Sequence, residues 1–396
     1  MERKYKVLVF GATGFTGKLC AKYLKENYPD LSWAIAGRNK DKLKQVKTEL
    51  DLDCDILIAD ANNYGELRNA VKMTKVLLTT AGPYAKYGSL LMKACIFENT
   101  HYVDITGENH WVKKQMDLYH EEAVARGIRI IPSCGYDSLP SDLGTLFAIN
   151  KMNKAVKKVE VFHSAFGGAS GGTIESIFTM GRLPKELRDP FVLNPKGSVS
   201  DLQRMNSKDS IKIKWIDEAK KWSGLGLFAV ANTRVVRRSA ALSKTIGKYY
   251  GDDFVYSEGA YYSKKRAAQK VSFMTMALGL VIISPLRKLL RRFFRKPGEG
   301  PSQKAMDSGF FKSRFLVETQ DGFRAFSMSS SGDPGYKMTS RMACESALCL
   351  AIEDPATLPG GVGFGGLLTP STGLGNTLVK RLKNIDVTFE EIPLID

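Results

Sequence analysis

The sequence is poor in cysteine and histidine, with six cysteines and four histidines among 396 residues. The cysteines lie far apart and form no C-x-x-C pair, which argues against a zinc ribbon or a disulfide-stapled scaffold and indicates a reducing compartment. The four histidines lack the spacing of metal ligands, so we expect no metal site. They are His101, His110, His120 and His163.

Long hydrophobic runs are also missing. The longest nearly uninterrupted apolar run, Val271–Ser284, has 14 residues, whereas a helix needs about 20 to cross a membrane. Met1 leads directly into charged residues and a strand-like run, so we expect no secretory signal. With 43% hydrophobic and 25% charged residues, the composition excludes intrinsic disorder and collagen-like repeats. The length predicts two or three packed units.

Acidic residues are outnumbered, with 41 Asp and Glu against 58 Lys and Arg. Between Asp201 and Lys296 the imbalance is greatest, 21 basic residues against 7 acidic ones. Such a segment attracts nucleic acid, an anionic lipid surface or an acidic substrate. Trp215, Trp222 and Tyr249 would suit nucleic acid, but no recognised nucleic-acid fold accompanies them, so we expect no nucleic-acid partner.

Short apolar runs alternate with helical patterns over the first 145 residues. This alternation predicts an α/β fold with a doubly wound parallel sheet, covered by helices on both faces. The predicted strands are Lys6–Phe10, Trp33–Ala36, Asp55–Ala59, Lys75–Thr80, Tyr102–Ile105 and Ile128–Ser133. The predicted helices are Gly17–Asn27, Lys40–Leu50, Tyr64–Met73, Leu90–Asn99 and Gln115–Arg126.

The pattern changes to that of a second, α+β unit from about residue 158. Its predicted elements are the strand Val159–Phe166, the helix Ile174–Met180 and the paired strands Arg314–Thr319 and Phe323–Met328. Ser340–Ile352 and Asn376–Leu382 then read as helices. We therefore predict a first domain over 1–150, a second over 151–338, and a C-terminal segment over 339–396.

A glycine-rich loop carries the chemistry. The first strand runs into Gly11, Ala12, Thr13, Gly14, Phe15, Thr16 and Gly17, which open a helix. Glycines allow the backbone to turn tightly and approach a pyrophosphate, and the helix N-terminus presents unpaired amides to it. After a buried strand and before further βα units, this pattern predicts dinucleotide binding. The alternative is a strand–helix turn without a ligand.

The end of the second strand favours NADP over NAD. An acidic residue there would bind the ribose of NAD, but the sequence has Arg38, whose guanidinium suits a 2′-phosphate. A solvated arginine is the alternative. Asp60, after the third strand, can face the adenine. Small residues after the fourth strand let a nicotinamide lie against the backbone; they are Thr80, Ala81, Gly82 and Pro83. An ordinary turn is the alternative for each of these two segments.

The chain resembles the saccharopine dehydrogenase-like oxidoreductases, a family that includes bacterial trans-acting enoyl reductases. The resemblance covers most of the chain and rests on the motifs Gly11–Gly17, Ala36–Arg38, Thr80–Tyr84 with Gly88, Tyr102–Glu108, Gly135–Gly144 and Leu368–Pro370. It implies an N-terminal Rossmann domain with an inserted second α+β domain, after which the C-terminal helices pack back on the first. It also implies nicotinamide-dependent redox chemistry, and association with membranes or lipid droplets.

Two loops within these motifs form the candidate catalytic region. Asp104, with Glu108 nearby, follows the fifth strand and is expected beside the cofactor. Tyr136 or Tyr84 can donate a proton, and Ser138 can orient a carbonyl. Ser141 or Asp142 reads equally as the cap of a helix that starts near Pro140.

Two other motifs compete with this assignment. Gly168–Gly172 matches the hydrolase pattern G-x-S-x-G around Ser170, but all four histidines precede the serine, so a glycine-rich wall of the substrate cleft is the better interpretation. Tyr261 and Lys265 match the pair of short-chain dehydrogenases, but they lie far outside the first domain, and we reject this match.

A basic amphipathic helix is predicted over 286–296, directly after the apolar run. The segment 271–296 therefore suits docking to an anionic membrane or lipid droplet; packing within the second domain or in a homodimer interface is the alternative. Together these features predict a cytoplasmic, peripherally membrane-associated, NADPH-dependent oxidoreductase that reduces a C=C, C=N or C=O bond of a lipid-like substrate. A nucleotide-binding scaffold and a saccharopine-type amino-acid dehydrogenase stay open.

Overall fold

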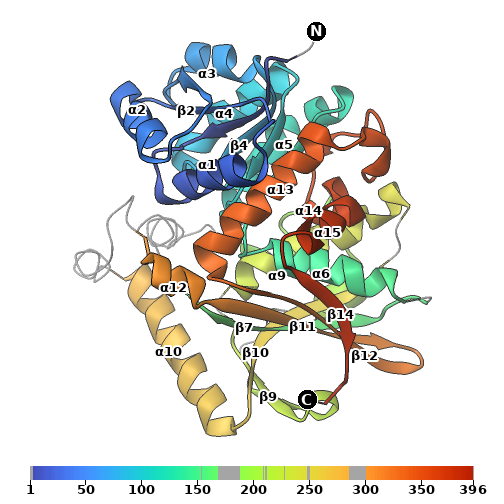
Figure 1. The fold of residues 1–396 in the computed structure, drawn as a ribbon. Coiled ribbons are helices and arrows are strands. Elements are labelled where there is room, and N and C mark those ends of the chain that lie inside the picture. Colours follow the sequence, from blue (N-terminus) through green and yellow to red (C-terminus); the bar gives the residue numbers. More distant parts are fainter. Residues whose placement is uncertain are drawn as a thin grey trace.

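Two seven-stranded sheets form the framework of the protein (Figure 1). The structure, a computed structural model, describes residues 3–152, 154–167, 188–207, 209, 212–226, 228–247, 250–284 and 300–395. The predicted helix Ile174–Met180, the Gly168–Gly172 motif with Ser170 and the predicted basic helix at 286–296 lie outside the described residues.

The first sheet is parallel throughout, in the order β13-β6-β5-β4-β1-β2-β3. Its central strands are apolar because helices cover both faces; Val7, Leu8 and Val9 are completely buried. The predicted doubly wound α/β fold is therefore confirmed. The strands are β1 (Tyr5–Phe10), β2 (Trp33–Gly37), β3 (Asp55–Ile58), β4 (Thr74–Thr79), β5 (His101–Asp104), β6 (Arg129–Ile131) and β13 (Gly366–Leu367).

Helices connect these strands, and one further helix from the C-terminal part of the chain packs on the same sheet. The connecting helices are α1 (Phe15–Asn27), α2 (Lys40–Glu49), α3 (Tyr64–Val71), α4 (Tyr84–Phe97) and α5 (Asn109–Ala125). The late helix α13 (Thr339–Ile352) packs beside α1 against β4 and β5 (Figure 1). Helices α4 and α5 begin six residues earlier than predicted, because buried contacts rather than local apolar spacing determine their first turns.

The second sheet is mixed, in the order β14-β12-β11-β7-β10-β9-β8. Only β7 and β10 pair in parallel. The predicted hairpin is present as β11 and β12, whereas the last strand, β14, is not predicted by the sequence patterns. The strands are β7 (Lys158–Phe166), β8 (Lys214–Ile216), β9 (Lys221–Gly224), β10 (Val255–Tyr262), β11 (Phe310–Thr319), β12 (Gly322–Ser331) and β14 (Thr388–Ile392).

Two helices lie between the sheets: α6 (Leu139–Asn150) and α9 (Ala229–Leu242). Helix α6 packs against β11 and α9, and α9 packs against β10 (Figure 1). The close approach of α6 requires Gly144, because a Cβ there would stand 2.0 Å from the Phe315 ring. The loop that precedes α6 therefore lies where the two sheets meet.

The other helices among the described residues are short, apart from α10 at the outer edge of the second sheet (Figure 1). They are α8 (Asp201–Asn206), α10 (Lys265–Ile283), α12 (Gln303–Asp307), α14 (Pro370–Gly373), α15 (Gly375–Lys383), the 3₁₀ turns η2 (Asp217–Ala219), η3 (Ser243–Ile246) and η6 (Pro355–Thr357), and the π-helical turn η5 (Pro334–Met338). No helix among the described residues combines the length and apolar character needed to cross a membrane.

Candidate active site

The glycine-rich loop connects β1 to α1 in a tightly packed turn. Gly11 has a φ of +86°, and a Cβ on it would lie 3.1 Å from the Cβ of Ala81 in the loop after β4. A Cβ on Gly17 would lie 2.3 Å from the carbonyl oxygen of Gly11. Only glycine satisfies these positions, as expected for a loop that lets backbone approach a ligand.

The first turn of α1 offers its amides to a ligand. Gly14 is the N-cap residue, and no side chain of the described residues caps the helix. Thr13, Phe15 and Thr16 are half-buried around this turn. Unpaired amides at a helix N-terminus, with the positive end of the helix dipole, are a binding site for a phosphate.

The second domain reaches this loop through aromatic contacts. The rings of Phe15 and Tyr336 meet edge to face, with centroids 5.3 Å apart. Gly300 packs so closely on Phe15 that a Cβ would stand 2.3 Å from the ring. The loop is thus fixed by groups from distant parts of the chain.

Arg38 follows β2 and is exposed. Its guanidinium makes no hydrogen bond or ion pair with any residue that the structure describes. No carboxylate occupies the end of β2, since the next residue, Asn39, caps α2 by accepting a hydrogen bond of 2.9 Å from the Lys42 amide. A free guanidinium at this position fits the 2′-phosphate of NADP.

Asp60 has a local structural role after β3. Its Oδ1 accepts hydrogen bonds from the Asn62 amide at 2.8 Å and from the Asn62 side chain at 3.1 Å.

The loop after β4 lies against the glycine-rich loop, where the Thr80 amide donates to the Phe10 carbonyl at 3.0 Å. Gly82 and Pro83 end this loop at the start of α4. The adenine and nicotinamide roles of these residues stay predictions.

Asp104 and Glu108 are buried carboxylates that hold the surrounding loops. Asp104 accepts hydrogen bonds from the amides of Thr106 and Ser133, both at 2.9 Å, and from the Tyr102 hydroxyl at 2.8 Å. Burial raises the pKa of Asp104 to about 7. The side chain predicted to face the cofactor is therefore committed to the protein, and it fixes the loops after β5 and β6.

Tyr84 is fully committed in the same way. Its hydroxyl donates to the Thr79 carbonyl at 3.1 Å, and the Ile105 amide donates to the hydroxyl oxygen at 3.4 Å. Burial raises the pKa of Tyr84 well above its ordinary value. These contacts favour a structural role over the proton-donor role predicted from the sequence.

Tyr136 and Ser138 lie in the loop between β6 and α6, and both contact other parts of the chain. The Tyr136 amide donates to Thr339 Oγ1 at 3.0 Å, and its ring packs on Phe311 with centroids 5.3 Å apart. Burial raises the pKa of Tyr136 well above its ordinary value. Ser138 Oγ donates to Asn232 Oδ1 at 3.2 Å.

Ser141 and Asp142 do not cap α6, so that expectation was wrong. The helix begins at Leu139, and both residues lie inside it. The Asp142 carboxylate instead accepts hydrogen bonds from the Ser239 hydroxyl and, at 2.7 Å, from the Ser371 amide. Tertiary bonds to α9 and to the C-terminal segment thus replace the expected local cap.

A polar cluster of the second domain, not predicted from the sequence, adjoins Ser138. Asn232 Nδ2 donates to Glu258 Oε2 at 3.0 Å, and His163 Nε2 lies 3.4 Å from the same oxygen. The His163 ring also contacts Ser141 Oγ at 3.2 Å and Ser313 Oγ at 2.9 Å. Its members come from α6, β7, α9, β10 and β11, so no spacing within the sequence could have revealed the cluster.

Asp137, between Tyr136 and Ser138, is a further residue that the sequence-based assignment did not include. It is half-buried, and its Oδ2 lies 3.9 Å from the position of a Cβ on Gly107. Burial raises its pKa to about 6.

The described residues also hold no cluster of His, Cys, Asp or Glu suited to a metal ion.

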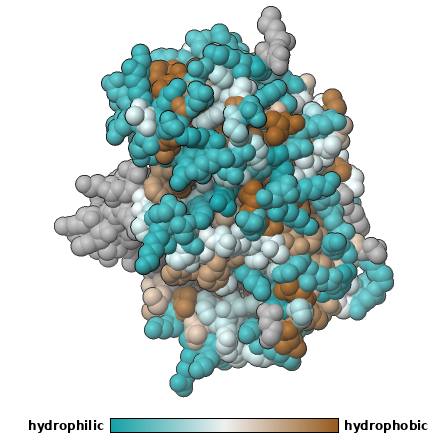
Figure 2. Space-filling view, in the orientation of Figure 1, coloured by the Kyte–Doolittle hydropathy of each residue, from teal (hydrophilic) through white to brown (hydrophobic). Residues whose placement is uncertain are grey.

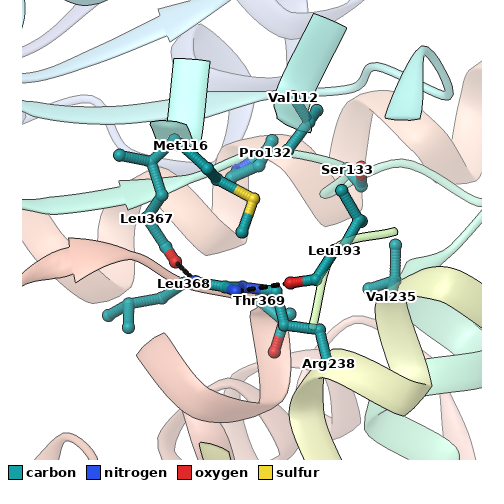
Figure 3. A pocket seen from close by; sticks show the side chains of 10 residues that line it. All are labelled: Val112, Met116, Pro132, Ser133, Leu193, Val235, Arg238, Leu367, Leu368 and Thr369. Carbon is teal, nitrogen blue, oxygen red and sulfur yellow. Dashed lines mark hydrogen bonds between the residues drawn. The ribbon is translucent and has the colours of Figure 1, made fainter. Parts of the chain in front are cut away.

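A small cavity at the carboxyl ends of β6 and β13 is separate from the cofactor loop (Figure 3). It is lined mainly by apolar side chains, with Arg238 on one side. The Arg238 guanidinium donates to the carbonyls of Leu193 and Leu367, both at 2.6 Å (Figure 3), and burial lowers its pKa to about 9. These bonds join α9 to the loop that holds Leu193 and to the end of β13, which indicates a structural role.

Comparisons with known proteins agree with this geometry. Residues 7–131 match the model of the saccharopine dehydrogenase NADP-binding domain. A Mycobacterium tuberculosis protein, provisionally named a trans-acting enoyl reductase, is 33% identical over 415 residues, covering 98% of this chain and 97% of its own. The trans-acting enoyl reductase of Mycobacterium ulcerans is 30% identical over 417 residues, with the same coverage.

A solved structure shares the fold. Saccharopine dehydrogenase (L-Glu forming) from Saccharomyces cerevisiae superimposes with a TM-score of 0.53 at 12% identity, covering 98% of this chain and 99% of that one. This likeness supports the arrangement of the two sheets.

Proposed function

Because the chain belongs to the saccharopine dehydrogenase-like oxidoreductases, which include the trans-acting enoyl reductases, we propose that it reduces a C=C, C=N or C=O bond in a lipid-like substrate. The observation that carries this proposal is the tight glycine-rich turn before the start of α1, which no described side chain caps, together with the exposed Arg38 after β2. The glycine-rich loop and the first turn of α1 would hold the pyrophosphate, and Arg38 the 2′-phosphate. A bound nicotinamide supplies a hydride for such a reduction.

Reduction of a C=C bond is the favoured reaction within this proposal. The full-length relatives are named enoyl reductases. A saccharopine-type substrate would instead need free basic side chains to bind several carboxylates. The arginines of α9 are already paired: Arg234 and Arg237 with Asp209, and Arg238 with two carbonyls. This pairing argues against the amino-acid substrate.

An exposed apolar face on α10 supports work at a lipid surface. Phe273 is 71% exposed, Met274 58% and Leu280 64%, and Lys264, Lys265 and Arg266 are exposed at the start of the helix. Hydrophobic residues also reach the surface over the lower part of the face in Figure 2, where Figure 1 places α10. A surface that combines apolar and basic residues favours binding to an anionic membrane or to a lipid droplet in contact with the cytoplasm.

NADPH oxidation tests the proposed function. The purified protein is mixed with NADPH or NADH, anionic vesicles and, in turn, an α,β-unsaturated decenoyl thioester, the corresponding β-keto thioester and saccharopine-type amino acids. We expect oxidation of NADPH that depends on the enoyl acceptor. Cofactor binding without oxidation by any acceptor would support the alternative of a nucleotide-binding scaffold.

A further inference from the structure

Five carboxyl groups surround the loops that follow β5 and β6, and four of them are hydrogen-bonded within the protein. The paired groups are Asp104, Glu108, Asp142 and Glu258. Asp137 is the exception, because its carboxyl makes no hydrogen bond or ion pair with the described residues. Asp137 is half-buried, so a carboxyl group without a protein partner stays open there to solvent or to a ligand.

The residues on either side of Asp137 are firmly held. Tyr136 is fixed by its amide bond to Thr339 and by packing on Phe311. Ser138 is fixed through Asn232 to the second domain. The backbone around Asp137 is therefore anchored on both sides, while its carboxyl stays available. This combination is typical of a preorganised reactive group.

The position of Asp137 suits contact with a substrate. It lies beyond β6 and next to Gly107 in the loop beyond β5, at the carboxyl edge of the sheet, where doubly wound folds bind their ligands. It is half-buried, so a bound molecule can reach it while most water is displaced.

We propose that Asp137 is the proton donor of the reduction, an inference that rests on the proposed function. The O–H bond of its carboxyl breaks, and the proton forms a new bond at one atom of the substrate double bond. The other atom receives a hydride, with its two electrons, from the reduced nicotinamide. The Asp137 carboxylate then regains a proton from solvent.

The surroundings of Asp137 agree with this role. Burial holds its pKa near 6, so a fraction of the group is protonated close to neutrality. Tyr136, its neighbour in the chain, is influenced by the charges of both Asp137 and Glu258, and Glu108 follows Gly107 in the loop that Asp137 approaches. No cation among the described residues pairs with Asp137 to hold it ionised.

The test compares Asp137→Asn with the wild type and with Asp117→Asn, which removes an exposed carboxylate on α5. Calorimetry measures NADPH affinity, and NADPH oxidation with the decenoyl thioester gives kcat. Infrared spectroscopy of the cofactor-free proteins follows the carbonyl stretch of protonated carboxyl groups with pH. Asp137→Glu is the conservative variant that keeps the acid.

We expect Asp137→Asn to lower kcat at least ~100-fold and to leave the Kd for NADPH within about threefold. Asp137→Glu should have part of the wild-type activity, and the control Asp117→Asn should have all of it. One protonated-carboxyl band near pH 6 should be missing only in Asp137→Asn. Retained kcat, or an unchanged infrared spectrum, would overturn the proposal.

Failure of the proposed function gives a different result. If the wild type binds NADPH but reduces no acceptor, the reductase assignment is wrong. The infrared comparison still decides whether Asp137 is the titrating acid that proton donation requires. If Asp137→Asn keeps every protonated-carboxyl band of the wild type, the role of Asp137 is rejected.

Discussion

The Glu108 carboxylate accepts a hydrogen bond of 2.9 Å from the backbone amide of Tyr84. Its second oxygen accepts another of 2.9 Å from the Ala85 amide. A carboxylate from the loop after β5 thereby caps α4, which follows β4. The two loops expected beside the nicotinamide are thus joined by a buried side chain, and each helps to position the other.

Replacing Glu108 with glutamine should destabilise the protein. The amide side chain keeps one acceptor oxygen but loses the second, and it also loses the charge that favours a helix N-terminus. We expect the free energy of unfolding to fall by about 1–3 kcal/mol, measured by urea unfolding. Glu122→Gln, on an exposed ion pair of α5, should change it by less than ~1 kcal/mol. Equal effects of the two changes would contradict the capping role.

Asp104 should make stability depend on pH. Its pKa is about 7 in the folded protein, against an ordinary value of 3.8, so the folded state keeps the proton that the unfolded state loses. The contribution of protonated Asp104 to the free energy of unfolding is therefore complete below pH 4, and it is lost as the pH rises to about 7. Between about pH 4 and pH 7, the free energy of unfolding of the wild type should fall by up to about 4 kcal/mol relative to that of Asp104→Asn.

Urea unfolding between pH 4 and 8 measures this difference. Asp117→Asn serves as the matched control, because that carboxylate is exposed, and its profile should run parallel to the wild type. A parallel profile for Asp104→Asn as well would show that Asp104 is not the group responsible.

Local sequence patterns predicted the dinucleotide-binding half well. Gly11 and Gly17 lie in the turn and the helix that directly follow β1, and Arg38 directly follows β2, so the local pattern predicts their positions. Ser141 and Asp142 fit a local capping pattern equally well, yet the Ser141 side chain contacts His163 on β7, and Asp142 is bonded to serines on α9 and the C-terminal segment.

The second-domain side of the site could not be predicted. His163 and Glu258 meet because β7 and β10 pair across more than ninety residues, and neither strand carries a motif. The strand β14 was missed for the same reason, since its pairing with β12 gives little local signal. Asp137 lay within a recognised motif, but only the contacts of its neighbours distinguish it from Tyr136 and Ser138.

Arg38→Ala should weaken NADPH far more than NADH. The free guanidinium is positioned to form charge-assisted hydrogen bonds with the 2′-phosphate, which NADH lacks. We expect the Kd for NADPH to rise roughly 10- to 100-fold, with that for NADH unchanged, as measured by calorimetry. Lys44→Ala, on the same helix as Lys42, is the control for general loss of positive charge. An equal loss for both cofactors would reject the 2′-phosphate assignment.

Gly17→Ala should disrupt the phosphate loop. Alanine normally stabilises a helix relative to glycine, but this Cβ would lie 2.3 Å from the Gly11 carbonyl oxygen. The backbone must move, at a cost of about 1–3 kcal/mol, and NADPH binding should be lost. Gly65→Ala on α3 is the matched control, since its Cβ finds its nearest neighbour at 3.5 Å. It should leave both stability and binding intact, whereas wild-type binding by Gly17→Ala would contradict the predicted loop.

The exposed face of α10 should bind lipid. Phe273→Asp with Leu280→Asp places two negative charges where apolar side chains would enter the interface, so binding loses both apolar burial and attraction to anionic lipid. We expect sedimentation with phosphatidylserine-containing vesicles to weaken at least ~10-fold, without loss of NADPH binding. Leu118→Asp with Val124→Asp changes two exposed apolar residues of α5 and should bind vesicles like the wild type. If the α10 variant also binds like the wild type, α10 does not mediate docking, and its apolar face serves another contact.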